Sequence, residues 1–87
     1  MNQKLAVELF KTFAENWLRG LGLKQLRKYA QDPKADLHVS WHLIGISFYA
    51  WLVEAGQPAP WIPKGAKQLV KITTDGVVFW VWYSKTA

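Results

Sequence analysis

The sequence predicts a single α+β domain in which N-terminal helices, two or three in number, pack on a C-terminal β-hairpin or small antiparallel sheet. Three observations support this fold class. Apolar residues recur at helical spacing through residues 2–30. Two apolar runs near the C-terminus flank Asp75-Gly76, a strong signal for a two-residue hairpin turn. The length of 87 residues suits one compact domain, residues 1–87.

The first predicted helix runs from Asn2, a suitable N-cap, to about Arg19. Gly20 and Gly22 end it, because glycine adopts the left-handed conformation of a helix terminus at little cost. We expect the centre of its buried stripe to be the row Leu5, Leu9, Phe13 and Trp17, widened by Phe10, Ala14, Leu18 and Leu21.

A short second helix is predicted over residues 23–30, ending before Asp32-Pro33. Leu23, Leu26 and the pair Tyr29/Ala30 are spaced to face inward. The remaining side chains are mostly basic and face outward: Lys24, Gln25, Arg27 and Lys28.

Residues 37–55 support two interpretations. Residues 37–43 alternate between apolar and polar, which is typical of a strand, whereas Ile44, Phe48, Trp51 and Ala55 fit helical spacing. We expect a third helix from residue 36 or 40 to residue 55, with a short strand over 37–41 as the alternative. Three helices and a hairpin also match a winged-helix arrangement, although this third helix has no Arg or Lys to meet base edges.

Residues 56–67 contain three prolines and two glycines and predict an ordered loop that Trp61 and Ile62 anchor to the core. The hairpin strands follow at 68–74 and 77–83. A two-residue turn fixes their register, so that Ile72 faces Phe79 on a core side.

The other side of this hairpin pairs Lys71 with Trp80 and Leu69 with Trp82. This second apolar side has three alternative fates. The loop with Trp61 covers it, a second copy or a partner protein covers it, or it is an exposed surface on which bases stack.

The same sequence gives little support for catalysis or for a bound cofactor. It has no cysteine, and the pair His38 and His42 lacks a convincing third metal ligand. We therefore expect no enzyme activity, cofactor or metal. The longest uncharged run, residues 37–53, contains two histidines and two serines, so we expect no membrane span. The absence of cysteine and of a recognisable secretory signal agrees with a cytoplasmic protein.

Eleven Lys and Arg residues against six Asp and Glu give a net charge of +5. This balance predicts a polyanionic partner, either nucleic acid or an acidic protein surface. The leading hypothesis is a small non-enzymatic nucleic-acid-binding or regulatory protein. Its expected phosphate contacts are Lys24, Arg27, Lys28, Lys67 and Lys71, and Trp80 and Trp82 would stack on bases.

Two alternatives use the same aromatic side. One is a protein-binding inhibitor or adaptor, of the compact kind that mobile genetic elements encode, anchored by Trp61, Trp80 and Trp82. The other is a homodimeric structural subunit, because a lone hairpin needs either a further strand or a second copy to form a stable sheet.

Overall fold

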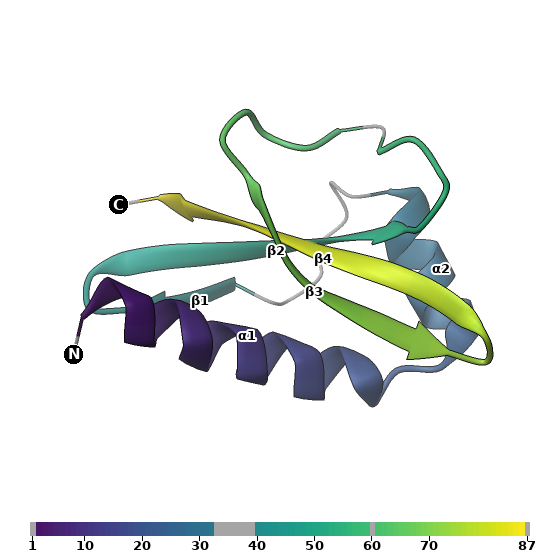
Figure 1. Cartoon of the computed structure of the whole chain (residues 1–87), viewed down its shortest axis with the longest axis horizontal. Helices are drawn as coiled ribbons and strands as arrows, with labels where there is room; N and C mark the ends of the chain where they lie inside the picture. Colours follow the sequence, from purple (N-terminus) through teal and green to yellow (C-terminus); the bar gives the residue numbers. More distant parts are fainter. Residues whose placement is uncertain (1, 33–39, 60, 87) are drawn as a thin grey trace.

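The computed structural model describes residues 2–32, 40–59 and 61–86. Two helices precede four antiparallel strands, which form one sheet in the order β1-β2-β4-β3. Both helices contribute to one core against the sheet, and the loop over residues 55–66 lies on the other side of the sheet from α1 (Figure 1). The predicted α+β class is therefore confirmed. The elements are α1 (Gln3–Arg19), α2 (Leu23–Gln31), β1 (Ser40–Leu43), β2 (Ile46–Glu54), β3 (Lys67–Thr74) and β4 (Val77–Thr86).

Helix α1 has the predicted ends but a different buried side. The Asn2 side chain accepts a hydrogen bond of 2.8 Å from the Leu5 backbone N–H, and Gly20 follows the last helical residue. The expected left-handed conformation was wrong, because Gly20 and Gly22 have φ of −77° and −75°. The fully buried row is Ala6, Phe10, Ala14 and Leu18, whereas Leu5, Leu9 and Phe13 are exposed. The expected centre of the stripe was wrong by one residue, because the small side chains of the alanines let the helix lie close to the sheet.

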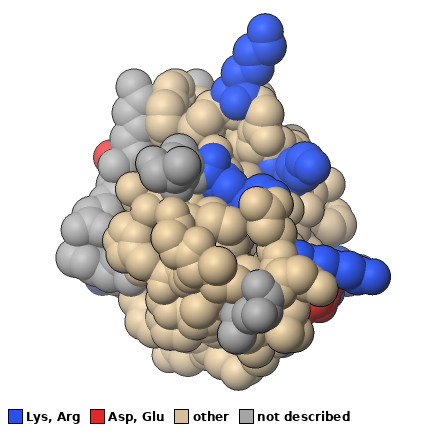
Figure 2. Space-filling view, turned by 90° about the vertical axis from the view of Figure 1, so that its left-hand side faces the viewer, with Lys and Arg blue, Asp and Glu red and all other residues tan. Residues whose placement is uncertain are grey.

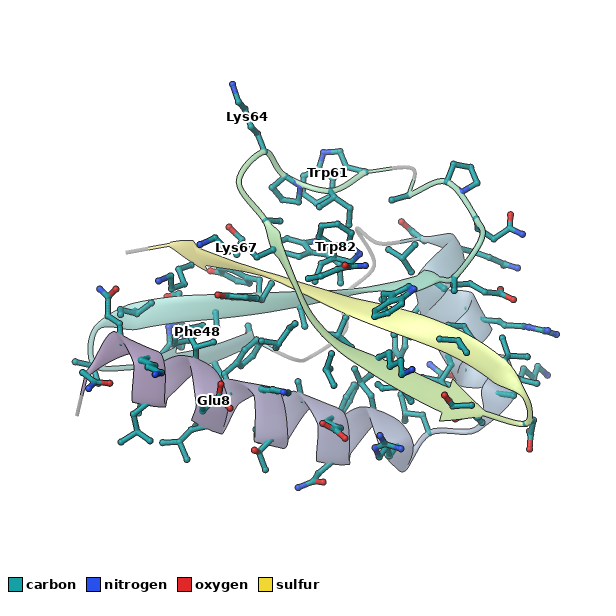
Figure 3. The ribbon with its side chains drawn as sticks, in the orientation of Figure 1. Glu8, Phe48, Trp61, Lys64, Lys67 and Trp82 are labelled. Atoms are coloured by element: carbon teal, nitrogen blue, oxygen red, sulfur yellow. The ribbon has the colours of Figure 1, made fainter. Side chains whose placement is uncertain are left out.

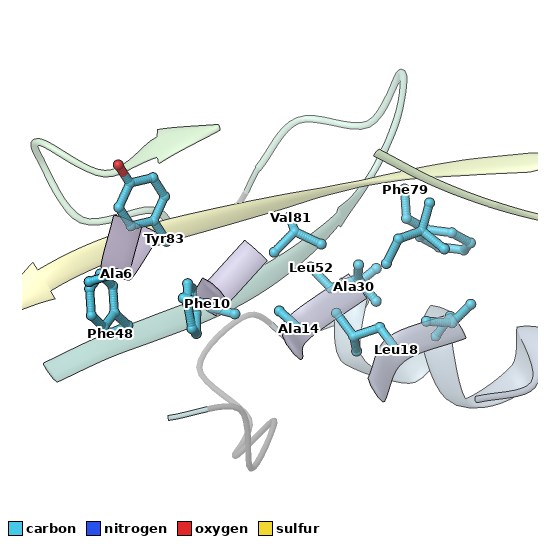
Figure 4. Packing of buried hydrophobic residues seen from close by; sticks show 13 residues of the cluster. Ala6, Phe10, Ala14, Leu18, Ala30, Phe48, Leu52, Phe79, Val81 and Tyr83 are labelled. Atoms are coloured by element: carbon cyan, nitrogen blue, oxygen red, sulfur yellow. The ribbon is translucent and has the colours of Figure 1, made fainter. Parts of the chain in front are cut away.

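The core lies between the two helices and the sheet (Figure 4). The Phe10 ring stacks on Phe48 with ring centroids 5.0 Å apart, and this joins α1 to β2. Helix α2 adds Leu26 and Ala30 to the same cluster. The strands contribute Phe48, Ala50, Leu52, Ile72, Phe79, Val81 and Tyr83.

Residues 40–54 form a β-hairpin, so the expected third helix was wrong. Strands β1 and β2 are joined by Ile44-Gly45 and pair Trp41 with Phe48. The apparent helical spacing arose because β2 is apolar on both of its faces over residues 48–53. The alternative of a short strand was closer, although residues 37–39 lie outside the described part of the chain. A winged-helix arrangement would need a helix where this hairpin lies.

The β3–β4 hairpin turns at Asp75-Gly76 as predicted. The expected pairs Ile72 with Phe79 and Lys71 with Trp80 are confirmed. Further along, an irregularity between Gln68 and Val70 changes the register, so that Gln68, and not Leu69, lies opposite Trp82. Such a bulge adds one residue to one strand only, and a turn signal does not encode it.

Candidate functional site

The sheet has a second apolar surface on the side away from the helices. Side chains alternate along a strand and directly paired residues share a side, so the register determines which residues line this surface. Trp51 and Gln68 flank Trp82, and Val53 and Lys71 flank Trp80. We call this surface the aromatic face, formed by Tyr49, Trp51, Val53, Gln68, Lys71, Trp80 and Trp82.

The loop over residues 55–66 covers part of the aromatic face. Its Trp61 ring packs edge-on against Trp51, with centroids 5.9 Å apart and an interplanar angle of 68° (Figure 3). Trp51 is only 9% exposed, while Trp61 is 41% exposed. The prediction that Trp61 anchors the loop is confirmed, but the anchor lies on the aromatic face and not in the core beneath the helices.

Trp80 and Trp82, on the central strand β4, are both half-buried. Solvent therefore reaches both indoles only in part. Tyr49, at the end of the face near the β1–β2 turn, is 39% exposed. Of the three fates considered for this surface, the structure combines cover by the chain's own loop with partial exposure.

One lysine side chain belongs to the accessible part of the aromatic face. Lys71 lies directly opposite Trp80 on the edge strand β3 and is exposed. Lys64, in the loop, and Lys67, at the start of β3, are also exposed. The Lys64 side chain points away from the sheet in Figure 3, and Lys67 lies opposite Tyr83, at a strand position that faces the helices. In the end-on view of Figure 2, Lys and Arg atoms gather in the upper part, on the side of this loop. The surface thus joins indole rings to positive charge.

The predicted site residues divide into two groups in space. Lys67, Lys71, Trp80 and Trp82 belong to the β3–β4 hairpin, and Lys71 and both indoles share one surface. The remaining group lies on α2, which packs through its buried residues on the opposite side of the sheet. There, Arg27 Nη2 is 3.9 Å from Glu54 Oε1, which offsets part of its charge. The group on α2 is Lys24, Arg27 and Lys28, all exposed.

Sequence reasoning missed Tyr49, Trp51 and Val53 of the aromatic face. All three were assigned to a helix, so the pairing of Trp51 with Trp82 and of Val53 with Trp80 could not be predicted. The alternation of apolar and polar residues before residue 44 was the signal that could have placed them on a strand.

Other kinds of site find little support in the described residues. Ser47 Oγ and His42 Nδ1 form a cross-strand hydrogen bond of 2.6 Å at the surface. Within residues 2–32, 40–59 and 61–86, no cluster of three or more His, Cys, Asp or Glu side chains could hold a metal ion, and His38 lies outside these ranges. Neither α1 nor α2 has the length and apolar character required to cross a membrane.

No protein-family model, curated protein or solved structure matches this chain. Function is therefore inferred from the geometry and chemistry of the aromatic face.

Proposed function

We propose that the protein is a small non-enzymatic nucleic-acid-binding protein and that its ligand is single-stranded. The observation that supports this most strongly is that Lys71 on β3 lies directly opposite Trp80 on β4. Trp82 follows two residues after Trp80 along β4, on the same face. Adjacent rings and ammonium groups suit a ligand in which flat apolar bases alternate with phosphates.

Base stacking requires bases that are not already paired within a duplex. An indole contributes roughly 1–3 kcal/mol for each base that stacks on it. Residues two apart on one face of a strand are about 7 Å apart, so Trp80 and Trp82 can receive two neighbouring bases. Lys71 would then neutralise the phosphate beside Trp80, and Lys67, at the start of β3, and Lys64, in the loop, would contact phosphates further along the nucleic acid.

The basic residues of α2 have a smaller place in this proposal. These residues, Lys24, Arg27 and Lys28, lie on the other side of the sheet from the indoles. A short oligonucleotide bound to the aromatic face therefore cannot reach them. We still predict that they make additional phosphate contacts with a longer nucleic acid that passes around the edge of the sheet.

A titration of labelled oligonucleotides tests this function. At about 50 mM salt we expect single strands to bind at least about tenfold more tightly than duplexes, with a marked loss of affinity at about 200 mM salt. Three phosphate contacts correspond to a slope of about −2 in a plot of log K against log salt concentration. Undetectable binding of single strands at low salt would contradict the proposal.

Two variants locate the binding surface. Lys71→Gln should reduce the magnitude of the salt slope by about 0.7, because one phosphate contact is lost. Trp80→Leu should keep an apolar side chain on the sheet but weaken binding of every sequence by about tenfold, since the stacking surface is lost. Lys24→Gln is the matched control, because it removes the same charge from the opposite side of the sheet and should leave binding of a short oligonucleotide unchanged.

The protein-binding alternative uses the same surface. The exposed rings of Tyr49 and Trp61 favour it, because aromatic residues are enriched at the centres of protein interfaces. Salt dependence separates the two functions. Stacking and phosphate contacts weaken steeply as salt rises, whereas an interface dominated by buried indoles changes little.

A further inference from the structure

The aromatic face continues past Trp82 towards the β1–β2 turn. The row that follows Trp51 and Trp82 consists of Ser40, Tyr49 and Ser84, because directly paired residues share a side of the sheet. Successive rows lie about 7 Å apart along the strands. We call this region the polar end of the face, formed by Ser40, His42, Ser47, Tyr49 and Ser84.

The side chains of the polar end can both donate and accept hydrogen bonds. Four of them carry a hydroxyl group, and His42 carries an imidazole. Ser47 Oγ is already bonded to His42 Nδ1 at 2.6 Å, so Nε2 of the exposed ring is the nitrogen that a ligand can reach. Ser40 and Tyr49 are exposed as well, and Ser47 and Ser84 are half-buried. The polar end is therefore open to a ligand.

The polar end differs from the rest of the face in its charge. Lys71 lies on the row of Trp80, two rows away from Tyr49. Lys85 follows Ser84 in the sequence, but it points to the other side of the sheet, where its Nζ donates a hydrogen bond of 3.5 Å to Gln3 Oε1. No Lys, Arg, Asp or Glu is among the five residues of the polar end. This region therefore suits uncharged polar groups of a ligand better than phosphate.

We propose that the polar end is a third nucleotide subsite, in which a base stacks on Tyr49 and the surrounding hydroxyl and imidazole groups hydrogen-bond to uncharged groups of the same nucleotide. This inference rests on the proposed function, since it extends a nucleic acid already stacked on Trp80 and Trp82. The row of Tyr49 follows the row of Trp82 by about 7 Å, which is also the interval between Trp80 and Trp82. A third base can thus find a ring at the same spacing along the sheet.

Hydrogen bonds at the polar end supply a selectivity that the indoles lack. Stacking on tryptophan tolerates any sequence, because every base has a π-face. Uncharged donors and acceptors occur on base edges and on the ribose 2′-hydroxyl, and the side chains of the polar end can bond to either. The subsite therefore gives the protein a preference, for one base or for RNA over DNA, that originates at this end of the face.

Oligonucleotides of two lengths test the stacking part of the subsite. Tyr49→Leu keeps an apolar side chain but removes the ring, and it should weaken binding of a single-stranded hexamer by about tenfold. The same variant should change the affinity for a dinucleotide by less than about twofold, because Trp80 and Trp82 suffice for two bases. Tyr49→Phe is the matched control, since it keeps the ring and should keep the hexamer affinity within about threefold of the parent.

Two comparisons between ligands identify the hydrogen-bonded group. Oligouridylate and oligodeoxyuridylate differ only in the 2′-hydroxyl, and the four deoxy homopolymers differ only in their bases. We expect the parent to bind the members of at least one set with affinities that differ by at least about fivefold. His42→Ala combined with Ser84→Ala should reduce that ratio to below about twofold. Thr12→Val, which removes an exposed hydroxyl from α1 across the sheet, should leave the ratio unchanged.

The outcomes separate the subsite from the function on which it rests. Circular dichroism confirms that each variant folds. If single strands bind and depend on Trp80 but a folded Tyr49→Leu variant binds the hexamer as the parent does, the subsite is overturned and the proposed function stands. Equal affinity for every ligand in both sets, or a ratio that the double variant leaves unchanged, would overturn the subsite in the same way. If no single strand binds, or if Trp80→Leu changes nothing, the proposed function fails and the subsite fails with it.

Discussion

The two hairpins of the sheet have the same kind of turn but very different sequences at it. Asp75 and Gly76 have φ of 50° and 76°, and Ile44 and Gly45 have φ of 56° and 71°. Asp tolerates the left-handed region, whereas a β-branched residue there is strained. The β3–β4 hairpin is therefore encoded by its own turn, and the β1–β2 hairpin depends on contacts with the rest of the protein.

Those contacts come mainly from α1. Phe10 stacks on both Phe48 and Trp41, and Phe13 stacks on Trp41 as well. The difference between the hairpins teaches that one turn geometry can be specified either locally or by packing. Each route predicts its own response to mutation.

The largest effects should come from the buried rings of the two hairpins. Phe48→Ala and Phe79→Ala each remove a fully buried side chain, and we expect each to lower the free energy of unfolding by about 3–5 kcal/mol. Phe48→Ala should be the worse of the two by about 0.5–1.5 kcal/mol, because the stack on Phe10 is also lost. Urea denaturation measures both values. A loss below about 1 kcal/mol for Phe48→Ala would show that the first hairpin does not depend on this packing.

An exchange of turn residues should give intermediate effects of opposite sign. Ile44→Asp should raise the free energy of unfolding by about 1 kcal/mol, since the strain of a β-branched residue at positive φ is relieved. Asp75→Ile should lower it by a similar amount of about 1 kcal/mol for the converse reason. Thermal unfolding compares the two variants with the parent. A destabilised Ile44→Asp variant would mean that the exposed isoleucine makes contacts that outweigh its backbone strain.

This contrast explains what the sequence could and could not predict. The helix ends at Asn2 and Gly20 and the turn at Asp75-Gly76 follow from local chemistry, and all three were predicted. The first hairpin was missed because Ile44-Gly45 is not a turn signal and because β2 is apolar on both faces. The position of Trp80 beside Lys71 could be predicted from the register of the second hairpin. The packing of Trp61 on Trp51 could not be predicted, because it depends on the tertiary structure.

The smallest effect should come from the ion pair that links α2 to the end of the first hairpin. Arg27 and Glu54 are 3.9 Å apart, and their side chains are 48% and 28% exposed. Solvent screens such a pair, so Arg27→Gln should change the free energy of unfolding by less than about 0.5 kcal/mol. Urea denaturation at low and high salt checks this, and a loss above about 1 kcal/mol would assign α2 a larger part in holding the first hairpin.

The most direct test of the proposed function is an NMR titration of the folded protein with a short single-stranded oligothymidylate. The chain has six tryptophans, and each indole N–H gives its own signal. We predict that the indole signals of Trp80 and Trp82 and the amide of Lys71 shift together, while Trp17 on α1 does not respond. Shifts confined to α1 and α2, with the indoles of Trp80 and Trp82 unchanged, would contradict the assignment of the aromatic face as the binding surface.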